Sequence, residues 1–144
     1  MNHKGITKMM VSILILVLIL ATGLFLYFFF FGPPVEEAEC GLGINWKILS
    51  VAGQEDFCYN QQKQELRFTV ENGVTAPLIG VYVKIGDKDD YLENIIEPAG
   101  VFIGKAPFKG QISLIKLFPV IDFEGEAVAC LDEVIERTNL RNCS

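Results

Sequence analysis

The chain has 144 residues with 12 basic and 18 acidic side chains, and its formal net charge is −6. All 18 acidic residues lie from Glu36 onward with 10 of the 12 basic ones, so this portion carries 10 − 18 = −8. Because such a surface repels phosphate backbones and anionic lipid headgroups, we expect no nucleic-acid partner.

An uncharged run covers residues 9–31, with Lys4 and Lys8 before it and Glu36 as the first charge after it. As a helix, this run rises roughly 35 Å, which is enough to cross the hydrocarbon core of a bilayer. We therefore predict a cytoplasmic basic tail over residues 1–8 and a transmembrane helix over residues 9–31. Since basic flanks are retained inside, we expect a single-pass protein of the cell membrane with its C-terminal domain outside.

A cleaved secretory signal is the alternative interpretation of the same run. Ala21 and Gly23 are small residues behind the apolar stretch 9–20, as a signal peptidase site requires. Cleavage there would leave the apolar, aromatic run 24–31 at the new N-terminus, so we favour a retained signal anchor. A lipoprotein anchor is disfavoured because no lipobox precedes Cys40.

The motif Gly32-Pro33-Pro34 follows the apolar run and stops a helix, since consecutive prolines remove backbone donors and force an extended chain. We interpret residues 32–39 as a short acidic linker. The remaining residues 40–144 are enough for one compact extracytoplasmic domain with a single core and too few for two.

Alternation of apolar and polar residues predicts β-strands in this domain. In the segment 79–85, the alternation places Ile79, Val81, Val83 and Ile85 on one face. Pro119 is expected to end the strand before it. The predicted strands cover residues 44–51, 65–71, 79–85, 91–96, 101–103, 111–118 and 126–130, and the segment 131–140 is open between a helical turn and an edge strand.

About seven short antiparallel strands with frequent turns are typical of an immunoglobulin-like β-sandwich. The fold expected is therefore an all-β, immunoglobulin-like sandwich preceded by one N-terminal transmembrane helix. Its expected core comprises Trp46, Phe68, Val70, Val81, Val83, Ile112 and Leu114.

Four cysteines, Cys40, Cys58, Cys130 and Cys143, all follow the predicted membrane helix. In an oxidising compartment we expect them to form two disulfides. Of the three possible connectivities, we favour the pairs closest in sequence, Cys40 with Cys58 and Cys130 with Cys143. A zinc site is disfavoured because the spacings fit no zinc pattern and the only histidine, His3, is on the other side of the membrane.

The domain lacks the residues that common catalytic sites need. Without a histidine it contains no Ser-His-Asp or Cys-His arrangement, and it has no glycine-rich phosphate loop. The acidic side chains of Asp87, Asp89, Asp90 and Glu93 could bind calcium in principle, but a solvated turn over residues 86–90 is favoured. We therefore expect no catalytic residue, no metal, no cofactor and no enzymatic activity.

The N-terminal motif Lys4-Gly5-Ile6-Thr7-Lys8 before the apolar run resembles the N-terminus of archaeal type IV pilin-like and archaellin-like proteins. The resemblance implies cleavage by a prepilin peptidase after Gly5, so that the mature chain begins at Ile6. It also implies a helix that stays in the bilayer or packs with copies of itself in a filament, with the β-sandwich outward.

Two functions follow from these observations. The first is a pilin-like structural subunit of a surface filament, with the bilayer and copies of the chain as partners. The second is a monomeric, membrane-anchored module that binds an extracellular protein or glycan, motivated by the early helix stop at Gly32-Pro33-Pro34.

Overall fold

The computed structural model describes residues 3–31 and 35–143, without the side chains of residues 3–10 and 27–31. The chain divides into two compact units, Met1–Pro34 and Val35–Ser144. The first contains one helix, α1 (His3–Phe31), which includes the helix predicted over residues 9–31. Within the described residues, no helix meets the length and hydropathy that crossing a membrane requires.

The described side chains of α1 are apolar on every face of the helix. Each large hydrophobic side chain from Val11 to Leu26 is at least 51% exposed. Thr22 is a polar exception, and its hydroxyl donates to the backbone carbonyl of Leu18 at 2.8 Å within the helix. The helix therefore presents a largely apolar surface, which the hydroxyls of Ser12 and Thr22 interrupt in its described part.

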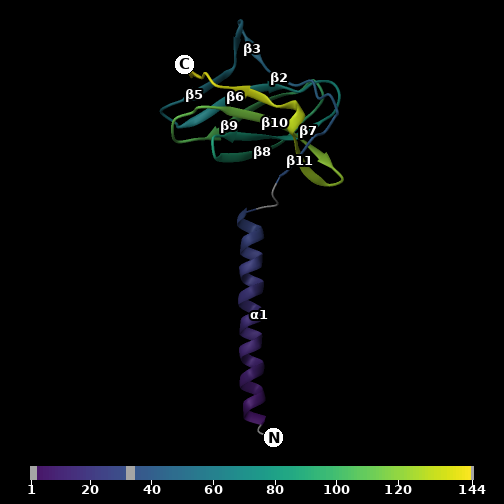
Figure 1. Cartoon of the computed structure of the whole chain (residues 1–144), viewed down its shortest axis with the longest axis vertical. Helices are drawn as coiled ribbons and strands as arrows, with labels where there is room; N and C mark the ends of the chain where they lie inside the picture. The colour runs from purple at the N-terminus through teal and green to yellow at the C-terminus, as the bar shows by residue number, and fades with distance from the viewer. Residues whose placement is uncertain (1–2, 32–34, 144) are drawn as a thin grey trace. The chain divides into compact units, whose positions relative to one another are not determined.

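The second unit is built mainly of β-strands in two sheets (Figure 1). Sheet A has the order β1-β11-β10-β7-β8, and β12 also pairs with β10. Its strands are β1 (Glu36–Ala38), β7 (Leu78–Ile85), β8 (Lys88–Ile96), β10 (Ile115–Phe123), β11 (Glu126–Cys130) and β12 (Ile135–Arg137).

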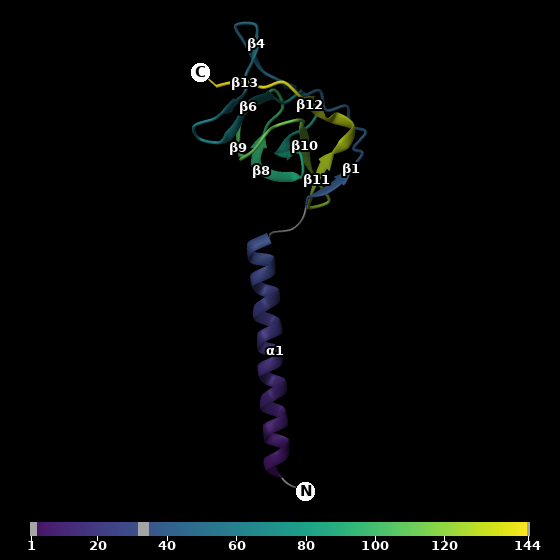
Figure 2. The same cartoon turned by 60° about the vertical axis from the view of Figure 1, so that its left-hand side comes forward.

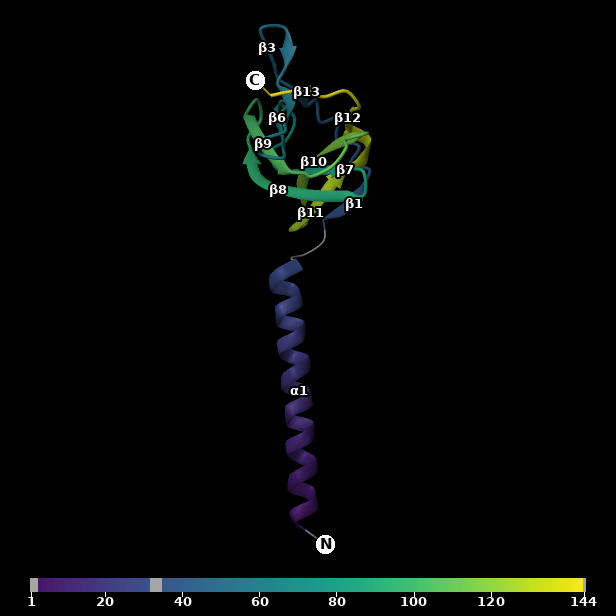
Figure 3. The ribbon, with the colours of Figure 1, turned by 90° about the vertical axis from the view of Figure 1, so that its left-hand side faces the viewer.

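Sheet B has the order β13-β5-β6-β2, with β9 on the other edge of β6. Its strands are β2 (Lys47–Ile48), β5 (Phe57–Asn60), β6 (Glu65–Glu71), β9 (Val101–Pro107) and β13 (Arg141–Asn142). A hairpin of β3 (Ser50–Val51) and β4 (Gln54–Glu55) projects from this unit (Figure 3). A 3-10 turn, η1 (Leu131–Glu133), follows β11.

Both sheets contribute to one hydrophobic core. On β6, Leu66, Phe68 and Val70 are fully buried, and on β7 Val81 and Val83 join the same cluster. β10 adds Ile115 and Leu117 to it. The alternation of side chains along each strand thus directs one face of each sheet into shared apolar packing.

Several predicted strands are confirmed at their boundaries. β6 and β11 coincide with the segments 65–71 and 126–130, and β7 begins one residue earlier than predicted. The expected core residues Trp46, Phe68, Val70, Val81 and Val83 are all buried. The structure thus confirms a mostly β domain and the central part of its core.

The predicted strand over residues 111–118 has the wrong bounds. β10 begins at Ile115 and continues through Pro119 to Phe123, so Ile112 and Leu114 lie before it and are only half-buried. Pro119 is tolerated because β12 pairs with β10 up to Leu117 and β11 pairs from Val120, which leaves Pro119 between the two partners. A missing backbone N–H there removes no ladder hydrogen bond on that side.

Two other strand predictions are corrected. A β-bulge between Leu78 and Gly80 turns Ile79 away from the core, so Leu78 takes the place expected for it. The predicted strand 44–51 contains only β2 and β3. Residues 131–140, left open by the sequence, contain both η1 and β12.

The predicted linker over residues 32–39 is too long. Its last residues form β1, which pairs in parallel with β11, and Glu36 lies opposite Val128 (Figure 2). β13 is likewise parallel to β5, so the all-antiparallel expectation is wrong at both ends of the domain. Gly32-Pro33-Pro34 lies outside the described residues.

Candidate functional site

The four cysteines form two disulfides, Cys40–Cys130 and Cys58–Cys143. Two disulfides are confirmed, but the favoured pairing of sequence neighbours is wrong. The reason is strand pairing: β1 places Ala38 opposite Cys130, and β13 places Arg141 opposite Cys58. The joined Cα atoms are therefore only 5.2 and 5.0 Å apart across 90 and 85 residues of chain.

Each disulfide attaches a short terminal strand to the body of the domain. Cys40 lies two residues after the end of β1, and Cys143 directly follows β13. Strands of two or three residues form too few hydrogen bonds to remain paired unaided. In the chain-entropy model, either disulfide alone stabilises the fold by about 4.5 kcal/mol, because each closes a long loop.

Asp132 in η1 reinforces the first of these attachments. Its carboxylate accepts the backbone N–H of Cys40 at 2.9 Å and that of Gly41 at 2.8 Å. These two hydrogen bonds lower the pKa of Asp132. The carbonyl of Glu133 accepts the Trp46 Nε1 proton at 2.6 Å, so η1 holds the segment between β1 and β2 at two points.

The proposed processing residues Lys4, Gly5 and Ile6 lie in α1. Their side chains are outside the described residues. Their role in processing stays a prediction.

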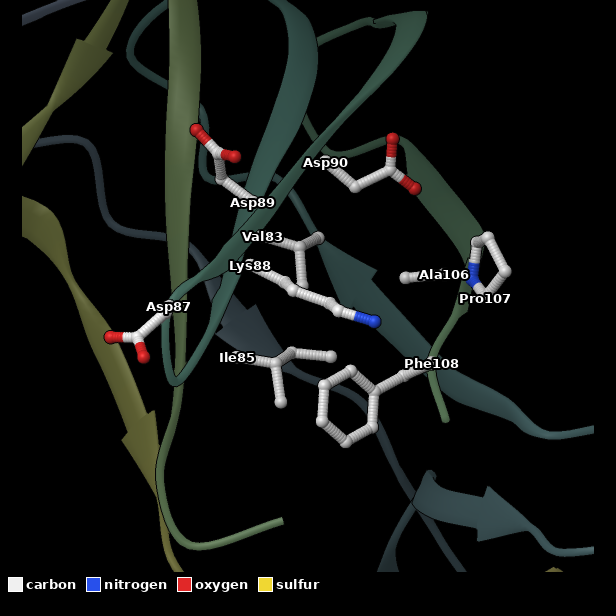
Figure 4. A pocket seen from close by; sticks show the side chains of 9 residues that line it. All are labelled: Val83, Ile85, Asp87, Lys88, Asp89, Asp90, Ala106, Pro107 and Phe108. Carbon is white, nitrogen blue, oxygen red and sulfur yellow. The ribbon is translucent and has the colours of Figure 1, made fainter. Parts of the chain in front are cut away.

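The turn predicted over residues 86–90 is shorter in the structure, since Asp89 and Asp90 lie on β8. The acidic side chains in and beside it do not converge on one point. Asp87, Asp89 and Asp90 point in three directions (Figure 4), and Asp89 accepts the Tyr82 hydroxyl proton at 2.5 Å. Burial, followed by this hydrogen bond, raises the pKa of Tyr82. Among the described residues, no three histidine, cysteine or acidic side chains are grouped as metal ligands.

An open pocket of about 360 Å³ lies beside this turn. Val83, Ile85 and Phe108 supply its apolar floor, and Lys88 reaches over it with Nζ 5.6 Å from the centroid of the Phe108 ring (Figure 4). The lining holds no histidine, cysteine, serine or threonine. Its chemistry suits contact with a side chain of another molecule more than catalysis.

A second apolar cluster is separate from the main core. It includes Tyr82, Phe118, Val120 and Ala129 of sheet A. Beside it lies an open depression of about 400 Å³, which we call the lysine depression. It is lined chiefly by Lys84, Leu114, Lys116, Phe118, Leu131 and Val134.

Both lysines of this depression are paired within the chain. Lys84 forms an ion pair with Glu37, which also lines the depression, and Lys116 Nζ lies 2.7 Å from Glu136 Oε1. Both pairs are between 36% and 48% exposed, and exposed pairs of this kind contribute about 0–1 kcal/mol. The lysines are therefore open to exchange their partners. The sequence indicated neither this depression nor Asp132, because both depend on distant segments meeting.

No family model matches the sequence, and neither a curated protein nor a solved structure is significantly similar to it.

Proposed function

We propose that the protein is a membrane-anchored, extracytoplasmic structural protein and a pilin-like subunit of a surface filament. The observation that carries this proposal is the apolar surface of α1, exposed on every face from Val11 to Leu26. Burying such side chains is worth about 1.5–3 kcal/mol each, so a free helix of this kind is strongly driven into lipid or against other helices.

The membrane location rests on the sequence, in which the uncharged run extends over residues 9–31. Its nearest basic flanks, Lys4 and Lys8, lie before it, and the first charge after it is acidic. The two disulfides support an extracytoplasmic domain, because disulfides persist in oxidising compartments. The resemblance of Lys4-Gly5-Ile6 to a prepilin-type cleavage motif supports filament assembly over simple anchoring.

We also propose that the domain is a β-sandwich of immunoglobulin-like character. The support is a core shared by two sheets and a buried tryptophan, Trp46, within it. The parallel strands β1 and β13 are additions at the two ends of this arrangement.

A monomeric binding module is the second candidate, and one observation favours it. β8 and β9 each pair on one edge only within the described part of the chain. Ile95 on β8 and Val101 and Ile103 on β9 are 54–70% exposed. Unpaired strand edges with exposed aliphatic side chains can receive an extended segment of a partner.

Electron microscopy of cells that express the full chain, with variants at two glycines of α1, tests the filament. Gly5→Leu places a bulky residue at the proposed cleavage site, and Gly23→Leu makes the same change elsewhere in the helix, where an added Cβ meets nothing within 4 Å. We expect Gly5→Leu to abolish filaments and Gly23→Leu to retain them. Equal filament numbers in both variants would contradict processing at Gly5, and the absence of filaments with the unmodified chain would favour the monomeric module.

A further inference from the structure

The tip of the β10–β11 hairpin exposes a phenylalanine that has no packing partner in the core. Phe123 is 59% exposed and pairs with Glu126 across the turn. Its position in the strand alternation is that of Leu117 and Ile121, which face the core, but it lies beyond the core's end. Figure 1 shows this hairpin extending past its neighbouring strands.

Acidic residues surround this phenylalanine. Asp122, Glu124 and Glu126 are all exposed, and no basic residue lies between positions 122 and 126. Asp122 also fixes the turn, since its carboxylate accepts the N–H of Gly125 at 2.8 Å. We call residues 122–126 the acidic tip: an apolar ring in a fixed turn with three carboxylates around it.

The lysine depression offers the complementary chemistry. Its floor is apolar, through Phe118, Leu131 and Val134. Its two lysines, Lys84 and Lys116, are held only by exposed ion pairs with Glu37 and Glu136. The aromatic ring of the acidic tip can contact this apolar floor. The carboxylates beside it can then replace Glu37 and Glu136 as partners of the lysines.

Two other depressions are poorer matches for the acidic tip. The pocket at the β7–β8 turn contributes Asp87, Asp89 and Asp90 against Lys88, so it repels further carboxylates. The depression at Asn60 and Asn142 has an amide-rich lining without a lysine or a large aliphatic residue.

The acidic tip cannot fill the lysine depression of its own chain. Phe118 lines the depression and Phe123 belongs to the tip, and both are on the same extended strand. Five residues of strand separate them by roughly 16 Å. The acidic tip can therefore reach a lysine depression only on a second copy of the chain.

We propose that the acidic tip of one copy inserts Phe123 into the lysine depression of the next. This contact joins two different surfaces of the same chain, and such a heterologous contact extends into a ring or an open filament. It deepens the proposed filament function and rests on it, because it names the surfaces through which the β-domains of neighbouring subunits meet.

Site-specific photocrosslinking of the full chain in native membranes tests the contact. A benzophenone amino acid replaces Phe123, and a matched control places it at Val51, which is 60% exposed on the β3–β4 hairpin. We expect illumination to give covalent multimers from position 123 but not from position 51, with cross-linked peptides from residues 114–118 or 131–134 of another copy.

Charge exchange provides the second measurement and controls for misfolding. Lys116→Glu and Glu124→Lys should each lower the crosslinking yield several-fold, and combining them should restore it, which a folding defect cannot do. Lys105→Glu on β9 makes the same charge change outside the depression and should leave the yield unchanged.

The outcomes separate the contact from the filament. If filaments form but the crosslinks from position 123 map to other residues, or if neither charge change alters the crosslinking yield, this contact is overturned. The filament function would still stand. A chain that stays monomeric in membranes, with no multimer from either position, would overturn both.

Discussion

At the scale of single residues, the packing of Gly104 against Phe68 shows how closely the core is fitted. The two residues lie opposite each other on β9 and β6, and Phe68 is fully buried. A Cβ added at Gly104 would lie 2.2 Å from the Phe68 ring. The ring also meets Phe102 edge-on, with centroids 6.3 Å apart. The absent side chain at position 104 therefore makes room for the largest fully buried side chain, Phe68.

Gly104→Ala should lower the free energy of unfolding by about 1–3 kcal/mol, because the Phe68 ring must leave its place. Urea titration followed by tryptophan fluorescence measures this change. Phe68→Leu in the same chain replaces the ring by a smaller side chain, so the loss of unfolding free energy caused by Gly104→Ala should be smaller. Strictly additive effects of the two substitutions would contradict the steric explanation.

The carboxylate of Asp132 should make stability depend on pH. Its pKa is lower in the folded protein than its ordinary value, because it accepts the N–H groups of Cys40 and Gly41. The stabilisation is therefore present above the unfolded pKa of about 3.9 and is lost as the pH falls through the folded pKa. Asp132→Asn should lower the thermal midpoint at neutral pH and flatten its decline below about pH 4.

Asp87→Asn is the matched control for this prediction, since Asp87 is an exposed aspartate of the β7–β8 turn. It should leave the pH profile of the thermal midpoint unchanged. An unaltered profile in Asp132→Asn would show that its two hydrogen bonds do not contribute to acid stability.

At the scale of elements, the two terminal strands depend on their disulfides. β1 and β13 are short, largely exposed and parallel to their partners. Each is followed by a cysteine bonded into the neighbouring strand, β11 or β5. The disulfides thus keep both ends of the domain in place.

Removing one disulfide should free the strand beside it. In Cys40→Ser/Cys130→Ser, we expect the backbone N–H groups of residues 36–38 to exchange with solvent at least ten-fold faster. The counterpart Cys58→Ser/Cys143→Ser should instead accelerate residues 141–142, and both should lower the free energy of unfolding by about 2–5 kcal/mol. Uniform acceleration in both variants would contradict local attachment.

The elements also show which parts of the fold can be predicted from sequence. β6 alternates and is paired along its length, and so is β7 beyond its bulge, so local pattern and tertiary structure agree in Phe68, Val70 and Val81. The continuation of β10 beyond residue 118 could not be predicted, because Pro119 is acceptable only where β12 has ended and β11 has not begun. The disulfide partners depend likewise on parallel pairings that no local pattern reveals.

At the scale of the whole molecule, the hydrophobic core belongs to only one of the two units. Every residue of the main core cluster belongs to the domain, between Cys40 and Leu140. The apolar residues described in α1 are exposed and belong to neither core cluster. The domain is therefore expected to fold without the helix, whereas the helix needs an apolar environment that the chain does not supply.

A chain that lacks residues 1–34 should accordingly retain the thermal midpoint of the full chain within a few degrees and stay in solution without detergent. Calorimetry and sedimentation of the shortened chain measure both properties. A large loss of stability would mean that α1 is part of the folding unit.

The most direct test of the central proposal is intact mass and N-terminal sequencing of the protein from native membranes, without reductant. We predict a chain that begins at Ile6 and is lighter than its reduced form by two hydrogens for each of the two disulfides. A chain that begins at Met1 would contradict the pilin-like subunit, and one that begins at Leu24 would contradict a retained membrane anchor.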